Sequence, residues 1–192
     1  LNRHMALATE LDSLLRNGYV GRRPDTPEFV QRLQALYESR LGGSAAIAAN
    51  DEADGLQQAM LLMGVSGMGK TRFMRRWAAS LPAVIYHPDL HIYQIPVLHI
   101  ELPSNGESVA GLCNGIFSAV DKLVPGSNYL ENYALKGKPS VETLIQRTAS
   151  VLHRHCVGML IGDEVQNLTN ATKNKQTVMT ELVSLSNVLS LP

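Results

Sequence analysis

One glycine-rich segment constrains the fold of this chain more than any other feature. Residues 64–71 read Gly-Val-Ser-Gly-Met-Gly-Lys-Thr and match the pattern G-x-x-x-x-G-K-[ST] at every fixed position. The apolar run at residues 59–63 precedes this segment, and residues 72–80 follow it with a helical pattern. A continuous apolar run is typical of a strand that is buried on both faces of a parallel sheet. The sequence therefore predicts a buried strand, a phosphate-binding loop and a helix in succession.

The chemistry of this loop follows from its residue types. Glycines at three positions let the backbone wrap closely around a polyphosphate, so that successive N–H groups and the helix N-terminus face its oxygens. In loops of this kind the lysine reaches the β- and γ-phosphates and the hydroxyl binds magnesium. We therefore predict that Lys70 and Thr71 have these roles, and that the chain binds ATP with Mg²⁺. The predicted nucleotide-binding residues are Gly64, Val65, Ser66, Gly67, Met68, Gly69, Lys70 and Thr71.

A second motif places two carboxylates at the end of another apolar run. Met159-Leu160-Ile161 is followed by Gly162, Asp163 and Glu164. Open α/β sheets bind their ligands at the carboxyl ends of the strands. We predict that Asp163 holds magnesium through water and that Glu164 is the general base that polarises the attacking water. An ordinary helix cap is the alternative for this pair, and Gln166 and Asn167 could cap a helix or orient a nucleotide.

The remaining pattern predicts alternating strands and helices. Apolar spacing predicts N-terminal helices at residues 2–16 and from Thr26-Pro27 to about residue 41, and a polar linker follows. Alternation of the two element types favours an α/β fold with a parallel sheet flanked by helices, of the P-loop NTPase class. We expect a helical extension at 1–43, a linker or loop at 44–56 and the P-loop domain at 57–192. Further strands are predicted at 83–87, 96–102 and 157–161, and further helices at 107–123, 141–155 and 174–189.

Composition and charge exclude several classes of protein. Lys plus Arg equals Asp plus Glu at 17 each, so no overall field attracts the chain to DNA or to a membrane. Nucleic-acid binding would then need a local patch. The two cysteines, Cys113 and Cys156, lie far apart among apolar residues, which indicates buried thiols in a cytoplasmic protein. No apolar run of 18 residues and no secretory leader is present in this sequence, so we expect no membrane contact.

Histidines and arginines outside these motifs are expected to be structural. His153 and His155 have metal-ligand chemistry, but they end a predicted helix beside a buried strand and no second cluster completes a site. His87 and His91 flank a Pro-Asp turn, and we expect the same of them. The arginines on the helix after the loop favour a solvated face or a subunit contact over a DNA-reading face; they are Arg72, Arg75 and Arg76.

The sequence around both motifs resembles a known group of ATPases. The segments at 95–103 (Ile-Pro-Val-Leu-His-Ile-Glu-Leu-Pro), 111–113 (Gly-Leu-Cys) and 161–168 (Ile-Gly-Asp-Glu-Val-Gln-Asn-Leu) are similar to the TnsC and TniB group of transposition ATPases. These proteins belong to the AAA+ class. The resemblance runs from about Met60 to the end of the sequence, and the last segment is more selective than the shared P-loop. It implies a bacterial ATP hydrolase that regulates DNA transposition.

This resemblance also implies partners and missing parts. It implies a ring or filament of identical subunits on duplex DNA, which links a target-site selector to a transposase, as in CRISPR-associated transposons. The group's sheet continues to a strand with a polar sensor residue and then to a helical lid, and we expect both after the end of this sequence. We therefore expect weak turnover from this part alone. Arg147 and Arg154, on a predicted helix, are candidate contacts to DNA phosphates.

Other functions of the same motifs remain as alternatives. A helicase loader or an insertion-sequence helper ATPase would share every residue discussed above. A nucleotide or small-molecule kinase would also need the loop, but the Asp163-Glu164 pair favours water as the nucleophile. A signalling P-loop ATPase that holds ATP without DNA is a further alternative.

Overall fold

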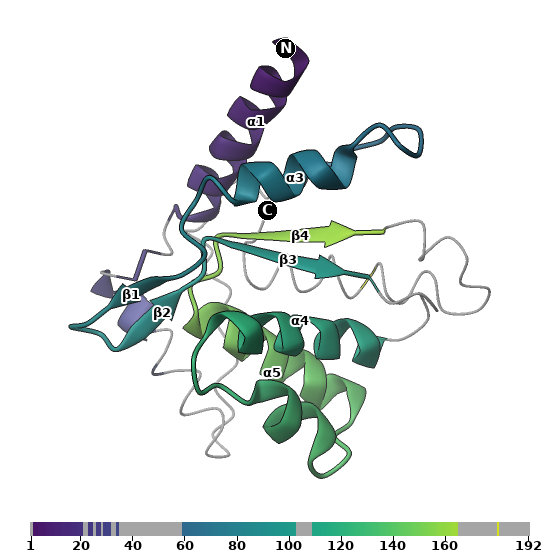
Figure 1. The fold of residues 1–192 in the computed structure, drawn as a ribbon. Helices are drawn as coiled ribbons and strands as arrows, with labels where there is room; N and C mark the ends of the chain where they lie inside the picture. The colour runs from purple at the N-terminus through teal and green to yellow at the C-terminus, as the bar shows by residue number, and fades with distance from the viewer. Residues whose placement is uncertain are drawn as a thin grey trace.

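The computed structural model describes residues 2–20, 59–102 and 109–164, together with isolated positions between 23 and 34 and at 180. Two strands form a central layer, with helices on both of its faces (Figure 1). The strands are β1 (Ile85–His87), β2 (Ile92–Gln94), β3 (Val97–Glu101) and β4 (Met159–Asp163). The helices are α1 (Asn2–Gly18), α3 (Lys70–Ala78), α4 (Val109–Leu123) and α5 (Val141–Arg154), and a π-helix, η1, spans Leu130–Leu135.

Strands β3 and β4 are parallel neighbours, which confirms the α/β prediction. Their register pairs Val97 with Met159 and Glu101 with Asp163. The chain between them passes through α4, η1 and α5, because a parallel connection needs a crossover. Alternate residues of β3, Leu98 and Ile100, are buried against α4 and α5. This main core fixes the carboxyl ends of both strands at one edge of the sheet.

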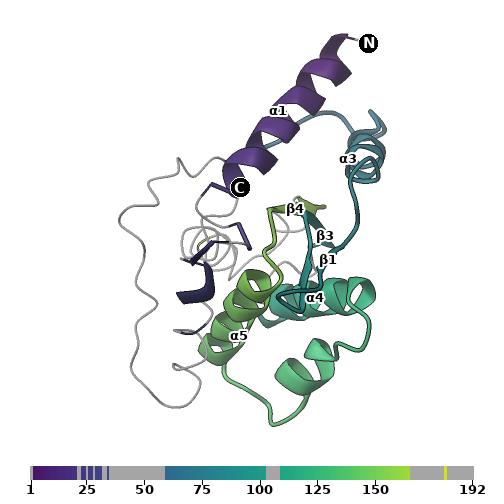
Figure 2. The same cartoon turned by 90° about the vertical axis from the view of Figure 1, so that its left-hand side faces the viewer.

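The opposite face of the sheet is covered by α3 and by part of α1. Leu11 and Leu15 of α1 share a buried cluster with Trp77, Met159 and Ile161. The indole Nε1 of Trp77 also donates a hydrogen bond of 2.9 Å to a carboxylate oxygen of Asp12, which links the two helices. The first turns of α1 are exposed and extend beyond the rest of the molecule (Figure 2). Helix α1 is therefore anchored to the sheet by its C-terminal half.

A β-hairpin lies at the opposite end of the sheet from Asp163 (Figure 1). Strands β1 and β2 are antiparallel, and the register pairs Ile85 with Gln94 and His87 with Ile92. The predicted strand at 83–87 is thus confirmed in part. The sequence did not predict β2 or η1, because each is short and has no clear period. The expected structural roles of His87 and His91 hold, since they bond to the side chains of Gln94 and Tyr86 respectively.

The prediction of a buried strand at residues 59–63 is wrong. These residues form no strand, and Met60, Leu61 and Met63 are 41%, 65% and 80% exposed. A strand needs a neighbour for its N–H and C=O groups. Within the described part of the chain β4 pairs only with β3, so residues 59–63 form no ladder with the other side of β4. The run therefore lies at the surface ahead of the loop.

The predicted helix that begins at Thr26-Pro27 is present at the positions that the structure describes. Pro27, Phe29–Gln31 and Gln34 are helical, and the Thr26 hydroxyl accepts a bond of 3.4 Å from the N–H of Phe29. The predicted linker and the domain boundaries near 43 and 57 lie outside the described residues, and so does the helix at 174–189 except for Thr180, which is helical. Cys113 and Cys156 are buried thiols and are not joined in a disulfide, as expected. Among the described helices, none is long and apolar enough to cross a membrane.

Candidate nucleotide-binding site

The glycine-rich segment forms an exposed loop that leads directly into α3 (Figure 1). Gly67 and Gly69 both have φ of 82°, in the left-handed region that suits glycine. A Cβ on Gly64 would lie 3.1 Å from the sulfur of Met68, a close approach to an exposed side chain that has room to move. Gly69 is the N-cap of α3 and provides no side-chain cap. The first N–H groups of the helix can therefore receive an anion.

Lys70 lies across this loop. Its Nζ donates to the carbonyl oxygens of Gly64 and Val65, at 2.7 and 3.1 Å. The lysine thus closes the loop onto its own backbone and holds one positive charge beside the loop's N–H groups. Phosphate oxygens would offer this ammonium a charged acceptor in place of neutral carbonyls. The position of Lys70 suits the role that the motif predicts.

Thr71 and Asp163 meet although 92 positions separate them in sequence. The Thr71 hydroxyl donates a hydrogen bond of 3.2 Å to Oδ1 of Asp163. Helix α3 positions the threonine in its first turn, and β4 positions the carboxylate as its last residue. The two predicted magnesium residues are therefore brought together at the carboxyl edge of the sheet, where α/β proteins bind ligands.

Glu164 directly follows β4 and is exposed. Its backbone N–H donates to Oδ1 of Asp163 at 2.9 Å, and its φ of 59° is unusual for a residue with a side chain. Strained backbone of this kind is concentrated at functional sites. The structure thus brings Glu164 to the same edge as Lys70 and Thr71. Gln166 and Asn167 lie outside the described residues.

A cavity of about 190 Å³ is lined by these groups and by apolar side chains. His99 of β3 lines this cavity, and its Nε2 lies 3.7 Å from Oδ2 of Asp163. His99 was not predicted from the sequence. The signal that could have found it is a polar side chain between apolar neighbours in a strand that ends near an Asp-Glu pair. The lining includes Leu11, Leu14, Met60, Leu61, Leu62, Lys70, Thr71, Met74, His99 and β4 to Glu164.

The donor set at this edge suits magnesium. Mg²⁺ prefers oxygen ligands and is commonly held by one or two protein groups together with substrate phosphates and water. The Thr71 hydroxyl and the Asp163 carboxylate are oxygen donors in direct contact. Within the ranges that the structure describes, no group of three or more His, Cys, Asp or Glu could hold a metal without a substrate. The residues thus fit a magnesium ion that is bound together with a nucleotide.

The two arginines predicted to contact DNA are both on α5, on the sheet face opposite α3 (Figure 1). Arg147 donates to the carbonyl oxygen of Tyr133, and its guanidinium lies 5.6 Å from the centre of that tyrosine ring. Arg147 therefore has structural contacts, whereas Arg154 is exposed at the end of the helix. Neither residue lies at the loop. Their contact with DNA stays a prediction.

The predicted structural role of His155 is confirmed. His155 is 3% exposed, and its two ring nitrogens contact the carbonyl oxygen of Tyr93 and the hydroxyl of Tyr129. His153 stacks on Phe29 at 5.3 Å. A cavity of about 350 Å³ lies beside His155, between the hairpin and the loop after α4. This larger cavity lies away from the glycine-rich loop, and its lining contains no carboxylate.

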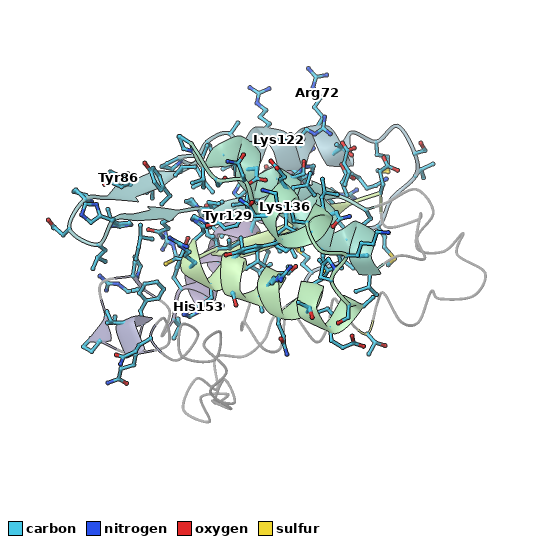
Figure 3. The ribbon with its side chains drawn as sticks, turned by 90° about the horizontal axis from the view of Figure 1, so that it is seen from below. Arg72, Tyr86, Lys122, Tyr129, Lys136 and His153 are labelled. Atoms are coloured by element: carbon cyan, nitrogen blue, oxygen red, sulfur yellow. The ribbon has the colours of Figure 1, made fainter. Side chains whose placement is uncertain are left out.

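The three exposed arginines of α3 have different surroundings. Arg75 forms an ion pair of 2.9 Å with Glu101, at the end of β3. Arg72 points away from the molecule (Figure 3), and Arg76 is also exposed. Their exposure fits both readings that the sequence left open, a solvated face and a subunit contact.

Comparison with known proteins identifies a family for this chain. The model of a family described as "AAA domain" matches residues 53–191, which include the loop, β4 and both carboxylates. No curated protein matches the chain.

Proposed function

This chain belongs to the AAA domain family, and from that premise we propose that it is an ATP-dependent regulator of DNA transposition. In this proposal the chain binds and hydrolyses Mg·ATP, assembles with copies of itself on duplex DNA and links a target-site selector to a transposase. The ATPase part rests on the family and on the site. The transposition part rests on the similarity of residues 95–103 and 161–168 to the TnsC and TniB group.

One observation carries the ATPase proposal, namely the hydrogen bond between Thr71 and Asp163. It joins the first turn of the helix after the loop to the last residue of β4, at 3.2 Å. A glycine-rich turn that occurred by chance would have no reason to place its threonine against a carboxylate from a distant strand. Such a pair is what a nucleotide-bound magnesium requires from the protein.

In this proposal, different residues of the site have different roles in hydrolysis. The N–H groups of the loop and the Lys70 ammonium bind and orient the triphosphate, and they offset charge on its oxygens. Glu164 accepts a proton from water as the water oxygen bonds to the γ-phosphorus. The bond from that phosphorus to the β,γ-bridging oxygen breaks, and ADP and phosphate are released. When bound through Thr71 and Asp163, magnesium supplies further stabilisation of negative charge.

Binding to DNA is proposed to depend on assembly. Zero net charge gives a single subunit little general attraction to DNA, whereas many weak phosphate contacts add up around a ring or filament. Contacts of this kind position a protein without reading sequence. The proposal therefore requires ATP-dependent, sequence-tolerant binding that weakens steeply with salt.

The test is to titrate a fluorescent duplex with the protein at several salt concentrations, with and without ATP, and to measure phosphate release with and without DNA. We expect binding only with ATP and a slope of about −0.9 in log affinity against log salt for each phosphate contact. Arg154→Ala should reduce the slope by about one contact, whereas Arg72→Ala should not. Tight, sequence-specific binding by a monomer would contradict the transposition proposal. ATP turnover that is independent of DNA would instead favour a signalling ATPase.

A further inference from the structure

The side of β3 that faces α3 contains an unexpected histidine. Val97 packs in the apolar cluster of α1, α3 and β4, whereas Leu98 and Ile100 belong to the core on the other face. Alternation along the strand therefore places His99 beside α3, with its side chain 23% exposed. An aliphatic residue would suit this apolar face better than a histidine. The ring nitrogens of His99 therefore need a hydrogen-bond partner.

Among the described residues, only Oδ1 of the Asp163 carboxylate accepts hydrogen bonds. Oδ1 accepts from the Thr71 hydroxyl and from the N–H of Glu164, at 3.2 and 2.9 Å. Oδ2 is the oxygen that faces His99, whose Nε2 lies 3.7 Å away. That separation is longer than a hydrogen bond. Within the described part of the chain, the buried Nε2 has no hydrogen-bond partner.

A buried nitrogen without a partner is unfavourable, and here it faces a carboxylate oxygen that accepts no hydrogen bond from the described residues. We propose that His99 is a positioning residue for Asp163, and that its Nε2–H donates to Oδ2 when the chain holds Mg·ATP. The contact fixes which carboxylate oxygen faces the metal. Outer hydrogen bonds of this kind orient metal ligands and alter metal affinity by 10- to 100-fold in other proteins. This inference rests on the proposed ATPase function.

The chain allows a matched set of substitutions. His99→Leu keeps the approximate volume and removes both nitrogens. His99→Gln places an amide nitrogen near the position of Nε2, and His99→Asn places one nearer the position of Nδ1, too short to reach Oδ2. His91→Asn is the control, because His91 is exposed on the hairpin turn, and asparagine tolerates its φ of 51°.

The experiment follows a fluorescent ATP analogue that is bound to each variant while Mg²⁺ is added, and repeats the nucleotide titration in EDTA. We expect His99→Leu and His99→Asn to raise the half-saturating Mg²⁺ concentration by about tenfold. Their affinity for the analogue in EDTA should match that of the wild type, and their melting temperatures without ligand should not fall below the wild-type value. His99→Gln should recover most of the wild-type response, and His91→Asn should equal the wild type.

Each other outcome overturns the proposal. A wild-type Mg²⁺ response in both His99→Leu and His99→Asn would show that His99 does not act on Asp163. Equal losses with and without Mg²⁺, or no difference between Gln and Asn, would show a structural role only. If the wild type itself gains no affinity from Mg²⁺, the proposed ATPase function fails, and this inference fails with it. The wild-type and variant titrations thus separate the two claims.

Discussion

Lys70 is bound by the carbonyl oxygens of Gly64 and Val65, so the loop is already closed around its one side-chain cation. Binding of a triphosphate would exchange these neutral acceptors for charged ones. Hydrogen bonds to charged groups contribute about 1.5 to 3 kcal/mol each. This difference makes Lys70 the residue whose removal should most affect nucleotide binding.

Replacing Lys70 with Ala is expected to lower ATP affinity by at least about tenfold, since one such contact is lost. Isothermal titration with Mg·ATP measures this change. Arg72→Ala is the control, because Arg72 belongs to the same helix and points to solvent (Figure 3). Unchanged affinity in Lys70→Ala, or an equal loss in both variants, would contradict the assignment of the loop.

Glu164→Gln is expected to retain ATP binding and to slow hydrolysis by at least roughly 100-fold, because the amide cannot accept the proton from water. The variant should consequently accumulate ATP-bound assemblies. Single-turnover phosphate release measures the chemical step directly. Glu131→Gln changes an exposed carboxylate on η1 and should turn over as the wild type does. Equal rates for the wild type and Glu164→Gln would place the base elsewhere.

Most of the site residues could be predicted from sequence, because each belongs to a motif of fixed spacing. The loop and the Asp163-Glu164 pair were found in this way. His99 was missed, since its importance depends on the register of β3 against β4, which spacing within one strand does not reveal. The partner of Arg147 was missed for a similar reason, because η1 was not predicted.

At the scale of elements, one buried histidine joins three segments at the end of the sheet away from the loop. His155, just after α5, contacts the carbonyl oxygen of Tyr93 in β2 at 2.8 Å and the hydroxyl of Tyr129, ahead of η1, at 2.9 Å. A carbonyl only accepts, so Nδ1 donates to Tyr93, and in the neutral ring Nε2 accepts from Tyr129. Burial lowers the pKa of His155 below its usual value, and the charge of Arg154 lowers it further.

This pKa gives the stability of the junction a definite dependence on pH. Below the unfolded pKa of about 6.5, the unfolded chain binds a proton that the folded His155 still excludes. The free energy of unfolding is therefore highest above pH 6.5. As the pH falls from 6.5 towards the lower folded pKa, the free energy of unfolding should decrease by up to about 1.4 kcal/mol per pH unit.

Urea unfolding at pH 7.5 and 5.5 measures this effect in the wild type and in His155→Gln. The variant should lose less stability on acidification than the wild type, because glutamine does not titrate. His91→Asn removes an exposed histidine and should lose as much as the wild type. An equal pH dependence in the wild type and His155→Gln would rule out His155 as the source.

Element prediction succeeded where a long segment had a clear period and failed where pairing decided the outcome. Helices α4 and α5 and strands β3 and β4 were found within a few residues of their bounds. The apolar run at 59–63 has the composition of a buried strand, but composition does not provide a neighbour, and the run is exposed. The short β2 is the opposite case: its sequence has no strand pattern, but its pairing with β1 makes it a strand.

At the scale of the whole molecule, packing on both faces of β3 and β4 fixes the position of their carboxyl ends, where Asp163 lies. The α4 and α5 core lies on one face and the α1 and α3 cluster on the other (Figures 1 and 2). Between them, the carboxyl end of β4 meets the first turn of α3. The central claim is that this edge binds ATP through magnesium.

The most direct test is isothermal titration of ATP into the wild type and into Asp163→Asn, each in Mg²⁺ and in EDTA. The wild type should bind ATP at least about tenfold more tightly with Mg²⁺, because Thr71 and Asp163 hold the metal on the nucleotide. Asp163→Asn should keep the EDTA affinity and lose most of the gain from Mg²⁺. Equal wild-type affinity in Mg²⁺ and EDTA, or a full Mg²⁺ gain in Asp163→Asn, would contradict the claim.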